Sequence, residues 1–198
     1  MTCDIFSAKV MIFKTPMKTP LHISSPTGIK KLVLRDHESC EIVLEDFEPG
    51  SRSFTLEVEM RGAGARCSIR GRIHVTGKDR KSWKIVQRFS GKSQEGTIDL
   101  RGIAEDASSL EFDGSAILDS GAKEVEVNVQ EKIWLFDHAQ GKALPILTVK
   151  TDRVKSARHA ASITSVDEGQ LFFLESRGIP RGAAETILKQ GFLNNYEL

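Results

Sequence analysis

The stretch Ser53-Phe54-Thr55-Leu56-Glu57-Val58-Glu59-Met60 alternates apolar with polar side chains, the pattern of a half-buried β-strand. Short alternating runs of this kind recur over roughly a hundred residues, and no helical stripe interrupts them. Glycines punctuate the runs and predict tight turns at Gly62, Gly64, Gly71, Gly77, Gly91, Gly96, Gly102, Gly114 and Gly121. The pattern predicts a mainly β fold and leaves a sandwich, a barrel and a β-solenoid open.

The overall composition is that of an ordinary globular protein of 198 residues, with 39% apolar and 28% charged residues. The formal net charge is +1, so we expect neither nucleic acid nor an anionic membrane as a partner. No apolar run reaches the length of a membrane span, and the first residues do not resemble a secretory signal. These features predict a cytoplasmic protein of one domain.

The three cysteines, Cys3, Cys40 and Cys67, are far apart and odd in number, which argues against a disulfide framework. Reduced thiols also agree with a cytoplasmic location. Cys67 shares an alternating apolar face with Ala65 and Ile69, so we expect it to pack in the core.

The first fifty residues are expected to form an irregular N-terminal arm (1–50) that includes the first short strands. Prolines fix φ and remove hydrogen-bond donors, so Pro16, Pro20 and Pro26 make regular structure improbable before residue 28. Short strands are predicted at 31–34 and 41–44. The β core then covers 51–164.

The last segment, 165–198, changes period and predicts a helical hairpin. Ser165 and Glu168 fit a capping box for a helix over about 166–176, with Gly178 as its left-handed stop. Pro180 suits the first turn of a second helix that ends near Gly191. The first helix is apolar nearly all round at 171–174, so it must be covered by the β body or by a partner.

The tail also carries the most specific sequence, Asp167-Glu168-Gly169-Gln170-Leu171-Phe172-Phe173-Leu174-Glu175-Ser176-Arg177-Gly178-Ile179, preceded by His159-Ala160-Ala161 and followed by Gly191-Phe192. Together with Ser90 to Gly96, Arg101-Gly102-Ile103-Ala104, Phe112-Asp113-Gly114 and Pro145-Ile146-Leu147, it resembles the SufB/SufD family of iron-sulfur cluster assembly proteins, in a short, SufD-like form. The resemblance implies a right-handed parallel β-helix (a β-solenoid) capped by a C-terminal pair of short α-helices.

This resemblance also implies a non-catalytic component of a Suf-type assembly complex. Such a component pairs with itself or with a SufB-like paralogue through the β-helix and docks a SufC-like ABC ATPase, which binds the nucleotide. The expected docking residues are Asp167, Gln170, Leu171, Phe172, Phe173, Ser176, Arg177, Gly178 and Phe192.

His159 falls on the family histidine of the pairing surface, which implies a role as a ligand of iron or of a transient iron-sulfur cluster at a subunit interface. Members of the SufB branch carry a cysteine and a glutamate where this chain has Gln130 and Ala160. Cluster binding usually depends on thiolates, so the chain is closer to a SufD-like partner than to the scaffold itself.

Two alternatives remain open from the sequence. β-Solenoids also include polysaccharide lyases and hydrolases, for which the candidate acids are Asp99, Glu105, Asp106, Glu111 and Asp113. A structural adaptor that binds the ATPase and no metal is the other. We predict that the chain is not an enzyme and has no catalytic residue.

Overall fold

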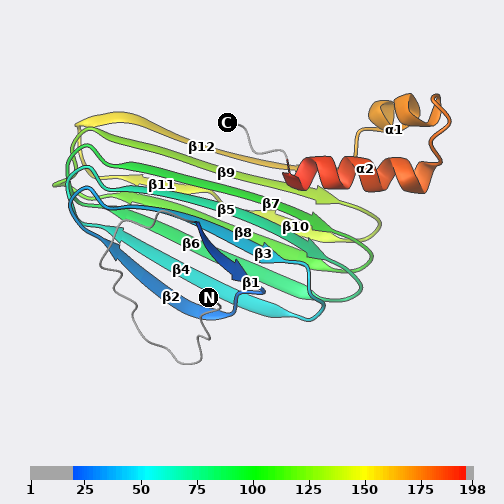
Figure 1. The fold of residues 1–198 in the computed structure, drawn as a ribbon, viewed down its shortest axis with the longest axis horizontal. Helices are drawn as coiled ribbons and strands as arrows, with labels where there is room; N and C mark the ends of the chain where they lie inside the picture. Colours follow the sequence, from blue (N-terminus) through cyan, green and yellow to red (C-terminus); the bar gives the residue numbers. More distant parts are fainter. Residues whose placement is uncertain (1–19, 195–198) are drawn as a thin grey trace.

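The computed structural model describes residues 20–194, which form parallel β-sheets followed by two helices (Figure 1). The strands are β1 (Leu21–Ser24), β2 (Gly28–Leu34), β3 (Ser39–Asp46), β4 (Arg52–Met60), β5 (Arg66–Val75), β6 (Arg80–Phe89), β7 (Glu95–Ala104), β8 (Ser109–Leu118), β9 (Val125–Leu135), β10 (Gln140–Ala143), β11 (Ile146–Val149) and β12 (Val154–Thr164). The helices are α1 (Glu168–Glu175) and α2 (Arg181–Asn194).

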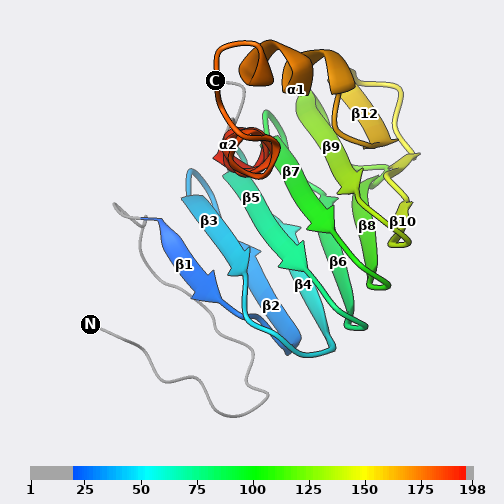
Figure 2. The same cartoon turned by 90° about the vertical axis from the view of Figure 1, so that its right-hand side faces the viewer.

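The strands form two sheets that lie face to face (Figure 2). Sheet A has the order β1-β3-β5-β7-β9-β12, and sheet B has the order β10-β8-β6-β4-β2, with β11 also paired to β8. Every pairing is parallel, so the chain winds from one sheet to the other and back in a β-solenoid of about five turns. The predicted fold class is confirmed.

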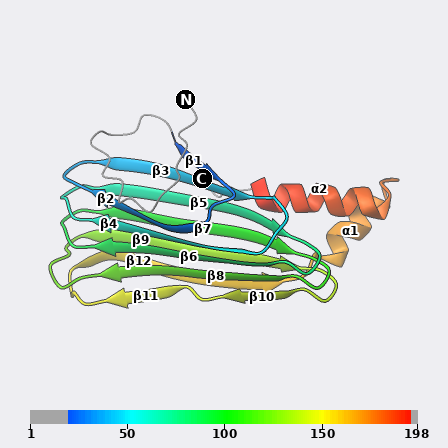
Figure 3. The same cartoon turned by 90° about the horizontal axis from the view of Figure 1, so that it is seen from below.

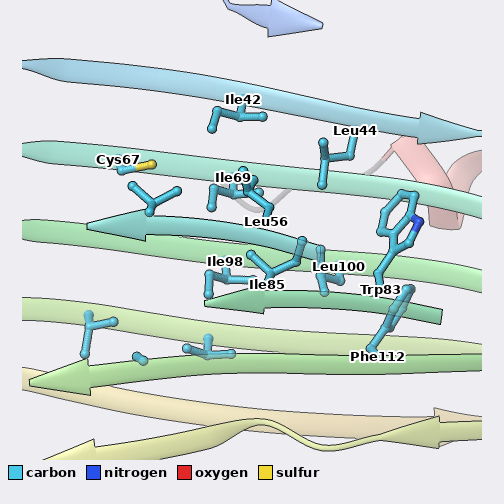
Figure 4. Packing of buried hydrophobic residues seen from close by; sticks show 14 of the residues in the cluster. Ile42, Leu44, Leu56, Cys67, Ile69, Trp83, Ile85, Ile98, Leu100 and Phe112 are labelled. Carbon is cyan, nitrogen blue, oxygen red and sulfur yellow. The ribbon is translucent and has the colours of Figure 1, made fainter. Parts of the chain in front are cut away.

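Stacking of equivalent residues fills the space between the sheets. Phe54 pairs in register with Trp83, and Trp83 pairs with Phe112, so one aromatic side chain lies above the next in successive coils. Ile69 and Ile98 form the same kind of column in sheet A (Figure 4). Because side chains alternate between the two faces of a strand, the inward half of each strand is buried and the outward half stays polar.

Several glycines that predict turns lie inside strands instead. Gly71 belongs to β5, Gly96 and Gly102 to β7, and Gly114 to β8, so the expectation of a turn at these positions is wrong. At Gly71, a Cβ would lie 2.6 Å from the Trp83 ring. The glycine is therefore a packing requirement of the core, which a sequence pattern cannot distinguish from a turn.

Regular structure begins earlier than the prolines predict. The short strand β1 pairs with β3, within the segment expected to be irregular, and β2 and β3 extend beyond the predicted ranges 31–34 and 41–44. Pairing with the next coil satisfies the backbone hydrogen-bonding groups there, although the local sequence pattern is poor for a strand. Residues 1–19 of the expected arm lie outside the described residues.

The helical hairpin extends past the ends of the strands (Figure 3). Asp167, and not Ser165, caps α1, because its side chain accepts a hydrogen bond from the Gly169 amide. Gly178 has φ +85° and ends this helix region as predicted. The second helix runs past Gly191 to Asn194, because its last turn packs on the solenoid.

A break in sheet B brings a buried carboxyl group into the core. Leu144 and Pro145 separate β10 from β11 opposite β8, and proline has no N–H to donate to the ladder. Glu131, from β9 in sheet A, reaches across and accepts a hydrogen bond from the Gly114 amide at 2.5 Å. Burial, supported by the charge of Asp113, raises the pKa of Glu131 to about 7.

The raised pKa of Glu131 predicts a pH-dependent stability. The folded state holds this proton more tightly than the unfolded chain, whose glutamate has a pKa of about 4.3. The stabilisation is complete below about pH 4 and is lost as pH rises to about 7, a change of about 3 kcal/mol in the free energy of unfolding. Denaturant unfolding should show this loss in the wild type and not in Glu131→Gln. The control is Glu126→Gln, at a partly exposed position on the same strand, which should behave as wild type. Equal pH profiles for all three proteins would contradict the prediction.

Candidate functional site

His159 lies on β12, the last strand of sheet A, with an exposed side chain. It pairs in register with buried Val129, so its side chain is on the inward face of the sheet, at the open end of the solenoid. Its Nδ1 lies 3.0 Å from the carbonyl oxygen of Pro145. A carbonyl only accepts, so Nδ1 is the donor, and in the neutral ring Nε2 keeps a lone pair. Metal-bound histidines commonly donate their other ring N–H to a carbonyl in the same way.

The Pro145 carbonyl is held by the break in sheet B described above. Leu144, its neighbour, donates its amide to the carbonyl of Phe112 at 3.0 Å. On the other side of the break, Ile146 pairs in register with Ser115. The backbone that orients His159 is therefore fixed on both sides.

Gln130 and Ala160 are register partners on β9 and β12. Gln130 lies between buried Val129 and Glu131, so it faces outward, and Ala160 shares that face. His159 faces inward. The two positions at which the resemblance implies a cysteine and a glutamate in the SufB branch are therefore adjacent to each other, but on the opposite face of the sheet from His159. Their side chains, an amide and a methyl group, offer no thiolate.

The outer edge of β12 is open. Residues 158–164 are all exposed, and within residues 20–194 no strand pairs with that edge. Ile163, an inward-facing residue by its pairing with Ile133, is 42% exposed because no further coil covers it. An edge strand of this length with unpaired backbone groups is a surface on which another chain can add.

Helix α1 contacts α2 and carries an exposed aromatic surface. Leu171 and Ala184 are fully buried between the two helices. Phe172 is 72% exposed and Phe173 is 53% exposed, and Arg177 lies over the Phe173 ring at 4.3 Å from its centroid. We call Phe172, Phe173 and Arg177 the α1 surface. The run 171–174 is thus covered by α2 on one side only.

Helix α2 is attached to the outer face of sheet A by its last turns. Phe192 stacks on Trp134 of β9, with ring centroids 4.3 Å apart and planes 13° from parallel. Arg101 donates to the Phe192 carbonyl at 3.1 Å, and Lys189 pairs with Glu105 at 2.9 Å. A cation at the carbonyl end of a helix is electrostatically favourable.

The remaining predicted docking residues have local roles in the hairpin. Asp167 caps α1, and the Ser176 hydroxyl donates to the Phe173 carbonyl at 2.8 Å. Gly178 adopts a left-handed conformation, and Gln170 is exposed on α1. Leu171 and Phe192 are thus engaged within the chain, whereas the other predicted docking residues are exposed. The α1 surface contributes the exposed aromatic side chains of that set.

Sequence reasoning missed Trp134, Arg101 and Pro145, which position the hairpin and His159. An aromatic residue at an outward strand position, as at Trp134, is a signal that could have indicated a covered patch. Among the described residues, no three His, Cys, Asp or Glu side chains gather closely enough to hold a metal ion. No helix of the described chain is long and apolar enough to cross a membrane.

Comparison with known proteins identifies several relatives. The iron-sulfur cluster assembly protein SufD of Bacillus subtilis is 39% identical over 104 residues, which are 52% of this chain and 24% of that protein. A SufBD family protein of Mycobacterium tuberculosis is 36% identical over 73 residues, 37% of this chain and 18% of the relative. One from Staphylococcus saprophyticus is 24% identical over 148 residues, 74% of this chain and 29% of the relative. The chain spans less than a third of each relative.

The family model described as "SUF system FeS cluster assembly, SufBD core domain" matches residues 33–192, from the second strand of the solenoid to the end of the hairpin. The match includes His159, the α1 surface and the contacts that attach α2. The chain therefore belongs to the SufBD core domain family of the SUF iron-sulfur cluster assembly system.

Proposed function

We propose that the chain is a non-catalytic, SufD-like component of a cytoplasmic iron-sulfur cluster assembly complex. In this complex the α1 surface docks a SufC-like ABC ATPase, which binds the nucleotide, and the β12 edge pairs with a second copy or with a SufB-like paralogue. The observation that carries the proposal is a pair of exposed phenylalanines on a hairpin that extends from the solenoid of a SufBD core domain. Exposed aromatic residues beside an arginine are typical of interface anchors.

The hairpin suits the docking of a large partner for a mechanical reason. Helix α2 is anchored to sheet A through Phe192 and Arg101, while α1 lies beyond the ends of the strands (Figure 1). A partner can thus contact Phe172 and Phe173 without displacing the solenoid. Burial of two phenylalanines supplies several kcal/mol of favourable transfer free energy, about 1.5–3 kcal/mol each.

The β12 edge and His159 support the second half of the proposal. Strand addition at an edge joins two sheets through main-chain hydrogen bonds. His159 would then lie close to the new interface with its Nε2 lone pair available. One imidazole cannot hold iron or a cluster alone, so the other ligands of this cargo would come from the partner. A thiolate from a SufB-like paralogue is the natural complement.

The lyase or hydrolase alternative finds no support in the placement of its acids. The side chains of four of them are engaged in ion pairs, Asp99 with Arg101, Glu105 with Lys189, Glu111 with Lys142 and Asp113 with Lys84. Paired carboxylates along a sheet are the usual surface chemistry of a solenoid. The adaptor that binds no metal remains the alternative, and the second experiment below distinguishes it from a component that holds iron.

The first prediction concerns docking. The double variant Phe172→Ser/Phe173→Ser should weaken binding to the SufC-like ATPase of the same genome by at least about tenfold, because both anchors lose their apolar area. Isothermal titration calorimetry measures the affinity. Ile29→Ser is the matched control, since Ile29 is 65% exposed on β2 at the other end of the molecule. Melting temperatures of all variants should stay within a few degrees, and unchanged affinity in the double variant would remove the docking proposal.

The second prediction concerns the cargo. His159→Asn keeps a donor near the Pro145 carbonyl but removes the imidazole ligand, so iron acquired by the assembled complex should fall several-fold. Iron per complex is measured after anaerobic reconstitution, with Ser162→Ala on the same exposed strand as the control. Complex formation, followed by size-exclusion chromatography, should be unchanged. Equal iron content in variant and wild type would favour the metal-free adaptor.

A further inference from the structure

Two thiols that the proposed function does not use lie side by side in the first coils of the solenoid. Cys40 on β3 and Cys67 on β5 are register partners in neighbouring parallel strands, 27 positions apart in the sequence. Both side chains face the core, with 7% and 3% of their surface exposed. Their sulfur atoms are 3.1 Å apart. Figure 4 shows Cys67 in the inward row of β5, in line with Ile69.

Covalent geometry permits a bond between these sulfur atoms without a change of backbone. Neighbouring strands are about 4.8 Å apart, and disulfides span Cα separations of about 4.4–6.8 Å. Side chains of register partners point to the same face, so the two Cβ–Sγ bonds already converge. Closing the sulfur atoms to the disulfide length of about 2.05 Å requires a movement of about 1 Å.

We propose that Cys40 and Cys67 are an oxidation site at which an intramolecular disulfide links the first coil of the solenoid to the second. A hydroperoxide is the oxidant. It transfers one oxygen to the sulfur of the more exposed Cys40, which gives a sulfenic acid and releases an alcohol, or water from hydrogen peroxide. The Cys67 sulfur then attacks Cys40, the S–S bond forms and the S–O bond breaks, and water leaves. Two thiols thus lose two electrons and two protons to one peroxide.

The surroundings of the pair make this a slow and selective reaction. The hydrogen bond with Cys40, together with burial, raises the pKa of the Cys67 thiol well above its ordinary value. A thiol that stays protonated at neutral pH reacts slowly with peroxide. The amide of Gln87 lies against the pair and donates to the Cys67 carbonyl at 3.1 Å. The link should therefore form under sustained oxidation, faster at higher pH, and should persist until a thiol reductant reaches it.

The disulfide would lie near the N-terminal end of the solenoid and would stabilise that end. Each coil of a solenoid is stabilised mainly by its neighbours, so a terminal coil opens most easily. Among the described residues, β3 is followed toward the N-terminal end only by the four-residue strand β1. A cross-link between β3 and β5 restrains this end by closing a loop in the unfolded chain. The oxidised protein would hold its first coil closed.

The experiment uses the full chain with Cys3→Ser, since Cys3 lies outside the described residues. The protein is incubated with hydrogen peroxide at pH 7 and pH 8.5, alkylated after denaturation, digested without reductant and examined by mass spectrometry. A cross-linked peptide containing Cys40 and Cys67 is expected. Both residues should become unavailable to alkylation together and should return after treatment with dithiothreitol. The oxidised protein should melt several degrees higher, with slower amide hydrogen exchange in β2 and β3.

The matched control is Cys3→Ser/Cys40→Ala, which keeps Cys67 and cannot form the link. Its melting temperature should not rise on oxidation. The proposal is overturned if both sulfur atoms remain alkylatable after oxidation with peroxide and with glutathione disulfide. Separate sulfinic acids without a cross-linked peptide would overturn it as well. A cross-link that leaves the melting temperature and the exchange of β3 unchanged would overturn the structural effect.

Discussion

In-register stacking of parallel coils is the constraint on which the rest of this structure depends. Each strand pairs with the equivalent strand one coil earlier and one coil later, so every inward side chain must fit its two neighbours in a column. The column of Phe54, Trp83 and Phe112 satisfies this with matched aromatic residues. In the column that contains Gly71, this position has no side chain, because the Trp83 ring occupies the space where a Cβ would lie.

The same constraint creates the candidate functional surface at the C-terminal end of the stack. A column of coils must stop, and where it stops a strand edge and part of the core become exposed. At the C-terminal end this leaves the inward face of β12 open, with His159 on it. The break between β10 and β11 adds the Pro145 carbonyl that orients the imidazole ring. Exposure and orientation of this histidine both follow from the way the solenoid ends.

The hairpin adds a second surface that is independent of the stack. Helix α2 is attached to the solenoid by an aromatic stack, by a hydrogen bond to a terminal carbonyl and by the ion pair of Lys189 with Glu105. Helix α1 is held by α2, with Leu171 and Ala184 buried between them. The phenylalanines of the α1 surface are thereby presented away from the body. A SufBD core domain with these two surfaces can contact two partners at once.

The local features of the protein follow from its sequence. Alternation over residues 53–60 and its recurrences established the strands, since period-2 burial is a property of each strand alone. Gly178 ended the first helix, because only a residue tolerant of positive φ fits there. The signature from His159 to Gly191-Phe192 indicated the family, which the family model over residues 33–192 then confirmed.

Contacts between residues of different coils emerge from the three-dimensional fold alone. The pairing of Cys40 with Cys67 depends on register between strands 27 residues apart, which no local pattern encodes. The reach of Glu131 to Gly114, 17 residues away, crosses from one sheet to the other. The same holds for the stacking of Phe192 on Trp134 and for His159 against Pro145. The neighbours of a side chain along the stack depend on the number of residues in each coil. That number includes every turn of the coil, so no short stretch of sequence determines it.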